Sequence, residues 1–148
     1  MITPESATKL RILPRLFSVT RATRTLMGYE LAKIGIHAGQ DELLLALDPE
    51  APRNVTLLAD ILKIRIPTVS RMLDRLVASG LVERVKDPID NRSTVVRITP
   101  AGIEMQDRIR EVWLGVEEEF KEMPQQGRAQ QDLERLGDVL TARLRRLR

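Results

Sequence analysis

The sequence contains no cysteine, which excludes disulfides, thiolate nucleophiles, cysteine-ligated zinc and redox sensing through a thiol. It contains one histidine, His37, and no nucleophile elbow accompanies it, so a hydrolase that uses His37 is only a remote alternative. Aromatic residues make up 3% of the chain, and no glycine-rich phosphate-binding loop is present. We therefore expect a protein that is not an enzyme and that needs neither a metal nor a cofactor.

Long hydrophobic runs are also missing from the sequence. The longest, such as Leu43 to Leu47, are far shorter than the roughly 20 residues that a membrane-spanning helix requires. The N-terminal segment from Met1 to Lys9 lacks the basic and then apolar pattern of a secretion signal. We therefore expect no membrane partner and a cytoplasmic location.

What the chain does have is charge, which accounts for 30% of its 148 residues, with a small net excess of +3. The distribution of that charge is more informative than its sum. Residues 65–97 contain seven basic and four acidic side chains. A locally basic segment suits an anionic partner such as nucleic acid, although a solvated surface is the plainer alternative.

Apolar residues recur with helical spacing through most of the chain, whereas two short stretches alternate like strands. Pro14 leaves two options for the first helix, which either begins near Leu13 or kinks at the proline. Thr99 followed by Pro100 is typical of a helix N-terminus. The predicted helices span residues 8–34, 38–47, 55–62, 67–79, 100–122 and 129–147, and the predicted strands span 81–86 and 94–98. The pattern predicts a mainly α protein with one small antiparallel β-hairpin.

The clearest indication of function is the pair of short helices predicted over residues 55–62 and 67–79, with a connector of only a few residues. That spacing is typical of a helix-turn-helix. In the second helix, Thr68, Arg71 and Arg75 recur at steps of three and four residues, opposite an apolar stripe. This face suits contacts with base edges and phosphates. An ordinary amphipathic helix with a solvated arginine face is the alternative.

The hairpin that follows the second helix is predicted to form a wing, with its loop at residues 87–93. Arg92 at the loop could enter a minor groove, whose negative potential attracts a guanidinium group. Asp90 could hold either that arginine or a nearby backbone amide. The alternative is an exposed turn with an incidental ion pair, which is worth little.

Residues 57–102, "LLADILKIRIPTVSRMLDRLVASGLVERVKDPIDNRSTVVRITPAG", resemble the winged-helix core of the MarR (multiple antibiotic resistance regulator) family. The motifs that carry the resemblance are "PTVSRMLDRL", "GLVER", the Asp-x-Arg of the wing and "RITPAG". The resemblance implies a homodimer that binds double-stranded DNA at a palindromic operator, usually as a repressor. It also implies release of DNA by a small phenolic or anionic ligand. The DNA-binding residues that it implies are Pro67, Thr68, Ser70, Arg71, Arg75, Asp90 and Arg92.

The same resemblance suggests how the single domain of residues 1–148 is organised. Residues 36–102 would form the winged helix-turn-helix core, and residues 8–35 and 103–148 would form dimerisation helices. The leucine-rich stripes of these outer helices exceed what a small winged domain can cover, which favours a partner copy. Three residues are candidates for an effector pocket, although surface or core positions are the plainer reading of each: Tyr29, His37 and Trp113.

Three residues depart from the usual pattern of the family. Lys63 occupies a turn position where glycine is common, and Arg65 replaces a serine that would cap the second helix. Ile66 occupies a position where a polar, DNA-contacting residue is frequent. Ile66 supports a second hypothesis, in which the winged fold serves as a protein-interaction module that does not read DNA.

Overall fold

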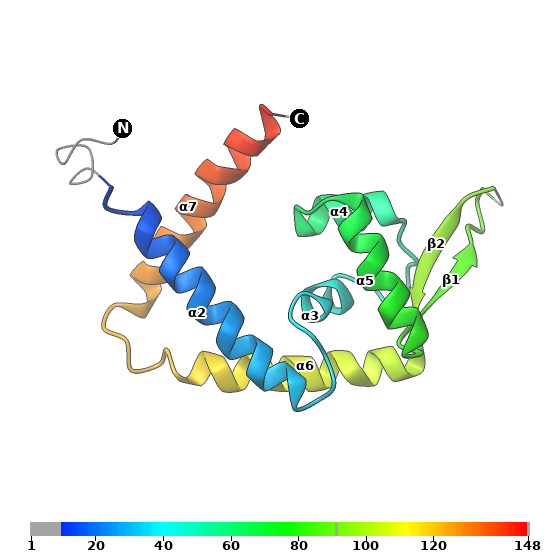
Figure 1. Cartoon of the computed structure of the whole chain (residues 1–148), viewed down its shortest axis with the longest axis horizontal. Coiled ribbons are helices and arrows are strands. Elements are labelled where there is room, and N and C mark those ends of the chain that lie inside the picture. Colours follow the sequence, from blue (N-terminus) through cyan, green and yellow to red (C-terminus); the bar gives the residue numbers. More distant parts are fainter. Residues whose placement is uncertain (1–9, 91, 148) are drawn as a thin grey trace. The chain divides into compact units, whose positions relative to one another are not determined.

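The computed structural model describes residues 10–90 and 92–147, which fall into two compact units divided between Val112 and Trp113. Over this described part, the chain is mainly helical with one two-stranded antiparallel hairpin, as the sequence predicts (Figure 1). The elements in chain order are α2 (Leu13–Ala32), α3 (Gln40–Leu45), α4 (Val55–Leu62), α5 (Ile66–Ala78), β1 (Val82–Lys86), β2 (Thr94–Ile98), α6 (Pro100–Glu118) and α7 (Gln126–Arg145).

Among the residues described, α2 begins at Leu13 with Pro14 in its first turn, which confirms the first of the two options and shows that the start near residue 8 and the kink are wrong there. Residues 8 and 9 lie outside the described residues. Proline suits the first turn because the amide that it lacks has no partner within the helix there. The chain leaves α2 through Gly35, whose φ of 80° lies in the left-handed region that glycine adopts easily.

The elements that flank the predicted DNA-binding face begin and end close to their predicted residues. α4 and β2 match the prediction, whereas α3 and α6 are shorter than predicted. Gly39, with a φ of 95°, delays the start of α3, and its N–H donates to Asp41 Oδ1 at 2.8 Å. At the end of α6, the amides of Glu119 and Phe120 bond to carbonyls three residues back, which tightens the last turn.

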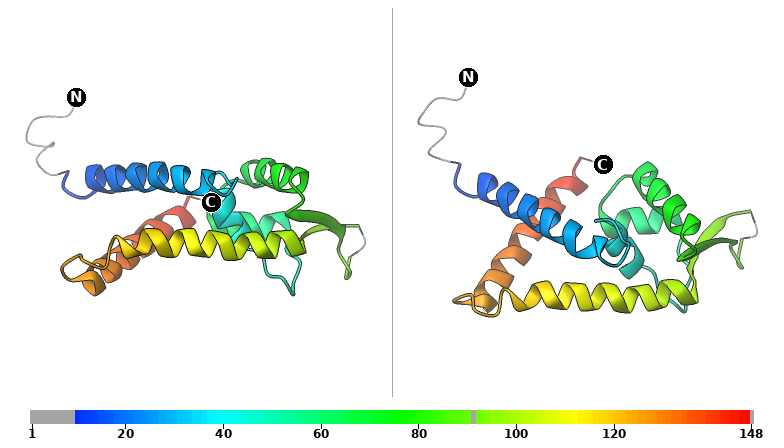
Figure 2. Two further views of the ribbon diagram at one scale, coloured as in Figure 1. Left: turned by 90° about the horizontal axis from the view of Figure 1, so that it is seen from below. Right: turned by 60° about the horizontal axis from the view of Figure 1, so that its bottom comes forward.

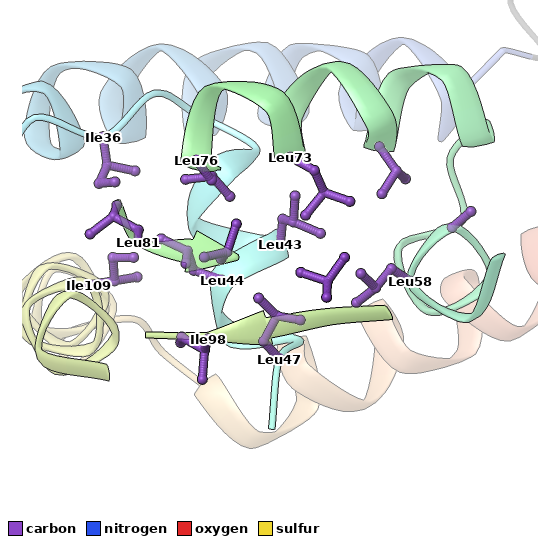
Figure 3. Packing of buried hydrophobic residues seen from close by; sticks show 14 of the residues in the cluster. Ile36, Leu43, Leu44, Leu47, Leu58, Leu73, Leu76, Leu81, Ile98 and Ile109 are labelled. Atoms are coloured by element: carbon purple, nitrogen blue, oxygen red, sulfur yellow. The ribbon is translucent and has the colours of Figure 1, made fainter. Parts of the chain in front are cut away.

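The hydrophobic core lies among α3, α5, β2 and the first half of α6 (Figure 3). Leu43 and Leu44 point into it from α3, and Leu73 points into it from α5. The predicted apolar faces are wider than those that the fold buries, because Ile61 and Val77 lie at the edges of their stripes and remain exposed.

A buried glutamine connects α6 to the end of α3. Gln106 is 1% exposed, and its Nε2 donates to the backbone oxygens of Leu44 at 2.6 Å and Leu47 at 2.9 Å. The Leu44 oxygen also accepts from the Leu47 amide at 3.1 Å, and Leu47 itself lies two residues past the end of α3, where no further helical turn supplies a donor. The buried Gln106 amide therefore has acceptors for its Nε2 donors, and it ties α6 to the chain at the end of α3.

The hairpin pairs β1 with β2 in antiparallel register from Val82 opposite Ile98 to Lys86 opposite Thr94. It projects away from the helices of its unit in both views of Figure 2. Arg53 adds a short bridge to Val96 that the sequence reading missed.

The predicted N-terminus of α6 is confirmed, because Thr99 Oγ1 accepts a hydrogen bond from the Gly102 amide at 3.1 Å and donates to the Gly80 oxygen at 2.7 Å. Gly102 is required at its position, since a Cβ there would lie 2.1 Å from the Leu81 oxygen.

The second unit contains the end of α6 and the whole of α7, and no residue of α7 is buried. Four of its leucines are well exposed to solvent along one predicted stripe: Leu133, Leu140, Leu144 and Leu147. The helices of the described part include none that is both long and apolar enough to cross a membrane.

Candidate nucleic-acid interface

Helix α5 separates an apolar side from a polar side, as the sequence predicts. Val69, Leu73 and Leu76 are buried and attach the helix to the core. The polar side displays four of the predicted DNA-binding residues in exposed positions: Pro67, Thr68, Arg71 and Arg75. Ser70 is only half-buried at the edge of this surface. An α-helix held in this way can offer its free side to the major groove of B-DNA, which is wide enough to admit it.

The basic segment divides into cations that have an acidic partner and cations that have none. Arg84 Nη2 pairs with Asp74 Oδ1 at 2.6 Å, and Arg97 Nε pairs with Glu83 Oε1 at 2.9 Å. Over residues 10–90 and 92–147, no carboxylate forms an ion pair with the remaining cations of the segment, which are Arg65, Arg71, Arg75, Lys86 and Arg92. The cations without a partner are therefore available to an external anion such as phosphate.

The tip of the wing is shaped by carboxylates that accept hydrogen bonds from backbone amides. Asp90 Oδ1 accepts from the Arg92 amide at 3.0 Å, so among the two options open to Asp90 the backbone amide is the one observed. The Arg92 side chain is exposed. Asn91, between them, lies outside the described residues. The other option, an ion pair between the two side chains, is not formed among the residues described, which leaves the guanidinium group available.

A second carboxylate, Asp87, fixes the other side of the tip. Its Oδ1 accepts from the Ile89 amide at 2.8 Å and from the Asp90 amide at 3.4 Å, and Ser93 Oγ donates to its Oδ2 at 3.2 Å. Mainly because the Ile89 amide stabilises the charged form, the pKa of Asp87 lies below its ordinary value of 3.8. The turn presents Ile89, whose side chain is 96% exposed and which the sequence reading did not single out.

The departures at the start of α5 have visible structural consequences. Lys63 adopts a left-handed conformation, with φ of 57° and ψ of 34°, at a turn position where glycine is favoured. Arg65 occupies the N-cap of α5 and makes no side-chain capping bond, whereas Asn54 caps α4 by accepting from the Leu57 amide at 2.7 Å. Ile66 is exposed at the first position of α5.

The three candidate effector-pocket residues lie in separate parts of the chain. Tyr29 projects from α2 with 71% of its surface exposed, and the exposed His37 lies in the connector before α3. The backbone amide of His37 donates to Gln40 Oε1 at 3.0 Å. Trp113 begins the second unit and is 41% exposed. Tyr29 and Trp113 are thus not core residues, and the pocket stays a prediction.

One contact that the sequence reading missed joins the two parts of the interface. The pair of Asp74 on α5 and Arg84 on β1 links the helix to the hairpin. The two residues are 10 positions apart and on different elements, so helical periodicity gives no sign of the pairing. Only the expectation that a hairpin packs beside α5 could have suggested it.

Comparison with known proteins gives concordant results. The MarR family model matches residues 38–94. The multiple antibiotic resistance protein MarR of Escherichia coli K12 is 34% identical over 77 residues, which cover 52% of this chain and 54% of the relative. The chain thus matches about half the length of this curated relative.

Solved structures extend the similarity over most of the chain. The crystal structure of wild-type, apo MarR from E. coli has a TM-score of 0.71 at 28% identity, and the match covers 88% of this chain and 98% of that one. A mutant E. coli MarR crystallised with operator DNA has a TM-score of 0.77 at 25% identity, covering 89% and 96%. The transcriptional regulator BldR from Sulfolobus solfataricus also has a TM-score of 0.77 at 25% identity, covering 95% and 99%.

Proposed function

We propose that this chain, whose residues 38–94 match the MarR family model, is a regulator of that family that controls transcription by binding double-stranded DNA through α5 and the wing. The observation that carries this proposal is the exposed polar side of α5, where Arg71 and Arg75 have no acidic partner among the described residues. Arg92 adds a third such cation at the tip of the adjacent hairpin. Mutant MarR from E. coli was crystallised with operator DNA, which supports the same role here.

The two arginines of α5 have different tasks in this proposal. Arg71 lies nearer the N-terminus of the helix, the end that recognition helices direct at base edges, so it is assigned to base contact. Arg75 lies one turn later and is assigned to a phosphate. A bidentate contact between arginine and guanine is worth about 1–3 kcal/mol of discrimination, whereas a phosphate contact carries no sequence information.

The wing supplies a contact in the neighbouring minor groove. Arg92 would enter the groove beside A·T-rich sequence, where the groove is narrow and its potential most negative. Asp90 holds the Arg92 amide and so limits the conformations of the tip before DNA arrives. Arg92→Ala should therefore weaken binding most on operators with A·T-rich flanks, and Asp90→Ala should weaken it less. Unchanged affinity in a folded Arg92→Ala protein would contradict the role of the wing.

The proposed assembly is a homodimer on a palindromic operator, acting as a repressor. The exposed leucines of α7 support a partner copy, since single helices with such stripes are seldom left uncovered. Two protomers related by a twofold axis would place two copies of α5 on the two halves of a palindrome. A small phenolic or anionic ligand is the proposed trigger of release; with no cysteine, oxidation of a thiol is excluded.

The test begins with selection of a preferred duplex from random DNA by the purified full-length chain, followed by affinity measurements on variants. Arg71→Ala should lower the affinity by about 1–3 kcal/mol and relax the preference at one base pair. Arg75→Ala should weaken binding to all sequences. Arg108→Ala is the matched control, because it removes the same charge from an exposed site on α6 and should leave affinity unchanged.

The alternative function is a winged module that binds proteins rather than DNA. It is favoured by the exposed Ile66 at the start of α5, where a polar side chain would suit DNA better. Selection that enriches no sequence, together with equal affinity of the protein and its Arg71→Ala variant for duplex DNA, would favour this alternative and contradict the proposal.

A further inference from the structure

An acidic residue lies on the same helix surface as the proposed DNA contacts. Asp74 follows Arg71 by three residues and immediately precedes Arg75, and its side chain is 67% exposed. A carboxylate in this position repels the phosphates of an approaching duplex. An exposed acidic residue between two DNA-binding arginines therefore needs a physical reason.

The partner of Asp74 supplies that reason. Asp74 Oδ1 accepts a hydrogen bond from Arg84 Nη2 at 2.6 Å, a short, charge-assisted contact. Arg84 lies in the middle of β1, opposite Val96 of β2, so the pair connects the recognition helix directly to the hairpin. The side chain of Arg84 is only 35% exposed, which means that it lies along the protein rather than free in solvent.

We propose that Asp74 is a positioning residue that, through Arg84, holds the wing at a fixed distance and angle from α5. This inference rests on the proposed DNA-binding function. Arg71 and Arg92 would act in neighbouring grooves of the same duplex, so one protomer can make both contacts only when the hairpin and the helix keep the spacing of the grooves. The pair thus raises the affinity for operator DNA by organising two contact sites before binding.

The pair is not needed to hold the fold together. Exposed ion pairs contribute little to stability. The connection between α5 and β1 is already secured by the buried Leu76, Leu81 and Val82, and by the left-handed Gly80 between the two elements. The hairpin should therefore remain folded without the pair, but its tip should move more freely relative to α5.

Positioning and simple electrostatics predict opposite results for one substitution. If Asp74 only adds a negative charge, Asp74→Asn should tighten binding to every duplex. If Asp74 positions the wing, the same substitution should weaken binding to the selected operator while binding to random duplex DNA stays the same or tightens. The ratio of the affinity for the selected operator to the affinity for random duplex DNA separates these outcomes. A residue that only stabilises the fold would not change this ratio.

The hairpin itself offers a matched control. Glu83→Gln breaks the ion pair between Glu83 on β1 and Arg97 on β2, which is 2.9 Å long and similarly exposed. It changes the net charge by the same amount as Asp74→Asn and alters the same region of the protein. It leaves the link between the wing and α5 intact, so it reports the effect of charge alone.

The experiment measures dissociation constants of the full-length chain for the selected operator and for a random-sequence duplex, at one salt concentration. We expect Asp74→Asn and Arg84→Gln each to lower the operator-to-random ratio by about three- to tenfold, and the double variant to lower it no further. Asp74→Glu should restore most of the ratio, and Glu83→Gln should leave it unchanged. Thermal unfolding of each variant confirms that the hairpin-containing unit is folded.

An unchanged ratio in Asp74→Asn, or an equal rise in both affinities as in Glu83→Gln, would overturn the positioning role while leaving DNA binding intact. If the unsubstituted chain itself shows no preference for any duplex, the proposed function fails and the positioning role fails with it. The two failures are therefore told apart by the behaviour of the unsubstituted chain.

Discussion

Both units contain amphipathic helices, but only the first unit buries the apolar sides of its helices. Every buried hydrophobic residue of the described part lies between Leu31 and Ile109, in the first unit. In the second unit Leu133, Leu140 and Leu144 of α7 remain exposed, and no residue of that helix is buried. The first unit thus has a hydrophobic core of its own, whereas α7 has no buried residue, and helical propensity alone rarely stabilises a helix in water. This difference supports the proposal that a partner copy covers α7.

The same comparison separates what amphipathic spacing predicts from what it leaves open. α5 and α7 both carry apolar residues at steps of three and four, and both are helices. In α5 the stripe is covered by the core, but in α7 the stripe is not covered. Periodicity therefore predicts the helix and its apolar side, and it does not identify the surface that covers that side.

The largest expected effect concerns the exposed stripe of α7. Replacing Leu140 and Leu144 together by aspartate should abolish the homodimer, because charged groups would then lie in the predicted interface. Sedimentation should show a monomer, and affinity for the operator should fall by about 100-fold or more, since two half-sites are no longer engaged together. A stable, folded monomer of the unsubstituted chain at micromolar concentration would contradict this prediction.

The next effect sharpens the contrast between the two units. Leu73→Ala in the core should lower the free energy of unfolding by about 2–5 kcal/mol, because it leaves a cavity. Leu133→Ala on α7 should lower stability in a way that depends on protein concentration, as expected where a partner buries the side chain. Urea denaturation at low and high protein concentration measures both effects. If the loss of stability depended equally on protein concentration in the two variants, the proposed difference between the two units would be contradicted.

The sequence predicted most of the local structure but little of what joins the elements. α4, β2 and the N-terminus of α6 follow from capping residues, alternation and the Thr99-Pro100 pair, all of which act over a few residues. The role of Gln106 and the bridge of Arg53 to Val96 could not be predicted, since each depends on residues more than 40 positions apart. These contacts are set by the tertiary packing.

The candidate interface shows the same limit. The exposure of Thr68, Arg71 and Arg75 follows from their spacing opposite the buried stripe. From the sequence, Asp90 could bind either the Arg92 side chain or a nearby backbone amide. The geometry of the turn shows that it accepts a hydrogen bond from the Arg92 amide. Which of these exposed residues touch DNA remains a prediction, because exposure alone does not identify a binding partner.

A smaller effect compares the two helices of the helix-turn-helix. Asn54→Ala removes the side-chain cap of α4 and should lower the free energy of unfolding by about 1 kcal/mol. Arg65→Ser would add the cap that α5 lacks and should raise it by a similar amount. Thermal unfolding of the two single variants measures both changes in the free energy of unfolding. Shifts of the same sign would contradict the assignment of the caps.

The smallest effect is confined to the tip of the wing. Because amide donors favour the charged form of Asp87, its carboxyl should titrate below pH 3.8, as NMR can measure. The hydrogen bonds contribute stability above that pH and are lost as the pH falls through the lowered pKa. Ser93→Ala removes one hydrogen-bond donor to the Asp87 carboxylate and should therefore raise the midpoint of the Asp87 titration. A midpoint at or above 3.8 in the unsubstituted chain would show that the turn is not formed.

The most direct test of the central claim is the salt dependence of binding to the selected operator. Each phosphate that a basic side chain neutralises contributes about −0.9 to the slope of the logarithm of affinity against the logarithm of salt concentration. We expect a steep negative slope for the unsubstituted chain and a slope that is less negative by about two for Arg75→Ala, one unit for each protomer. An affinity that does not change with salt, or an unaltered slope in Arg75→Ala, would contradict the proposal that α5 is held to DNA by its arginines.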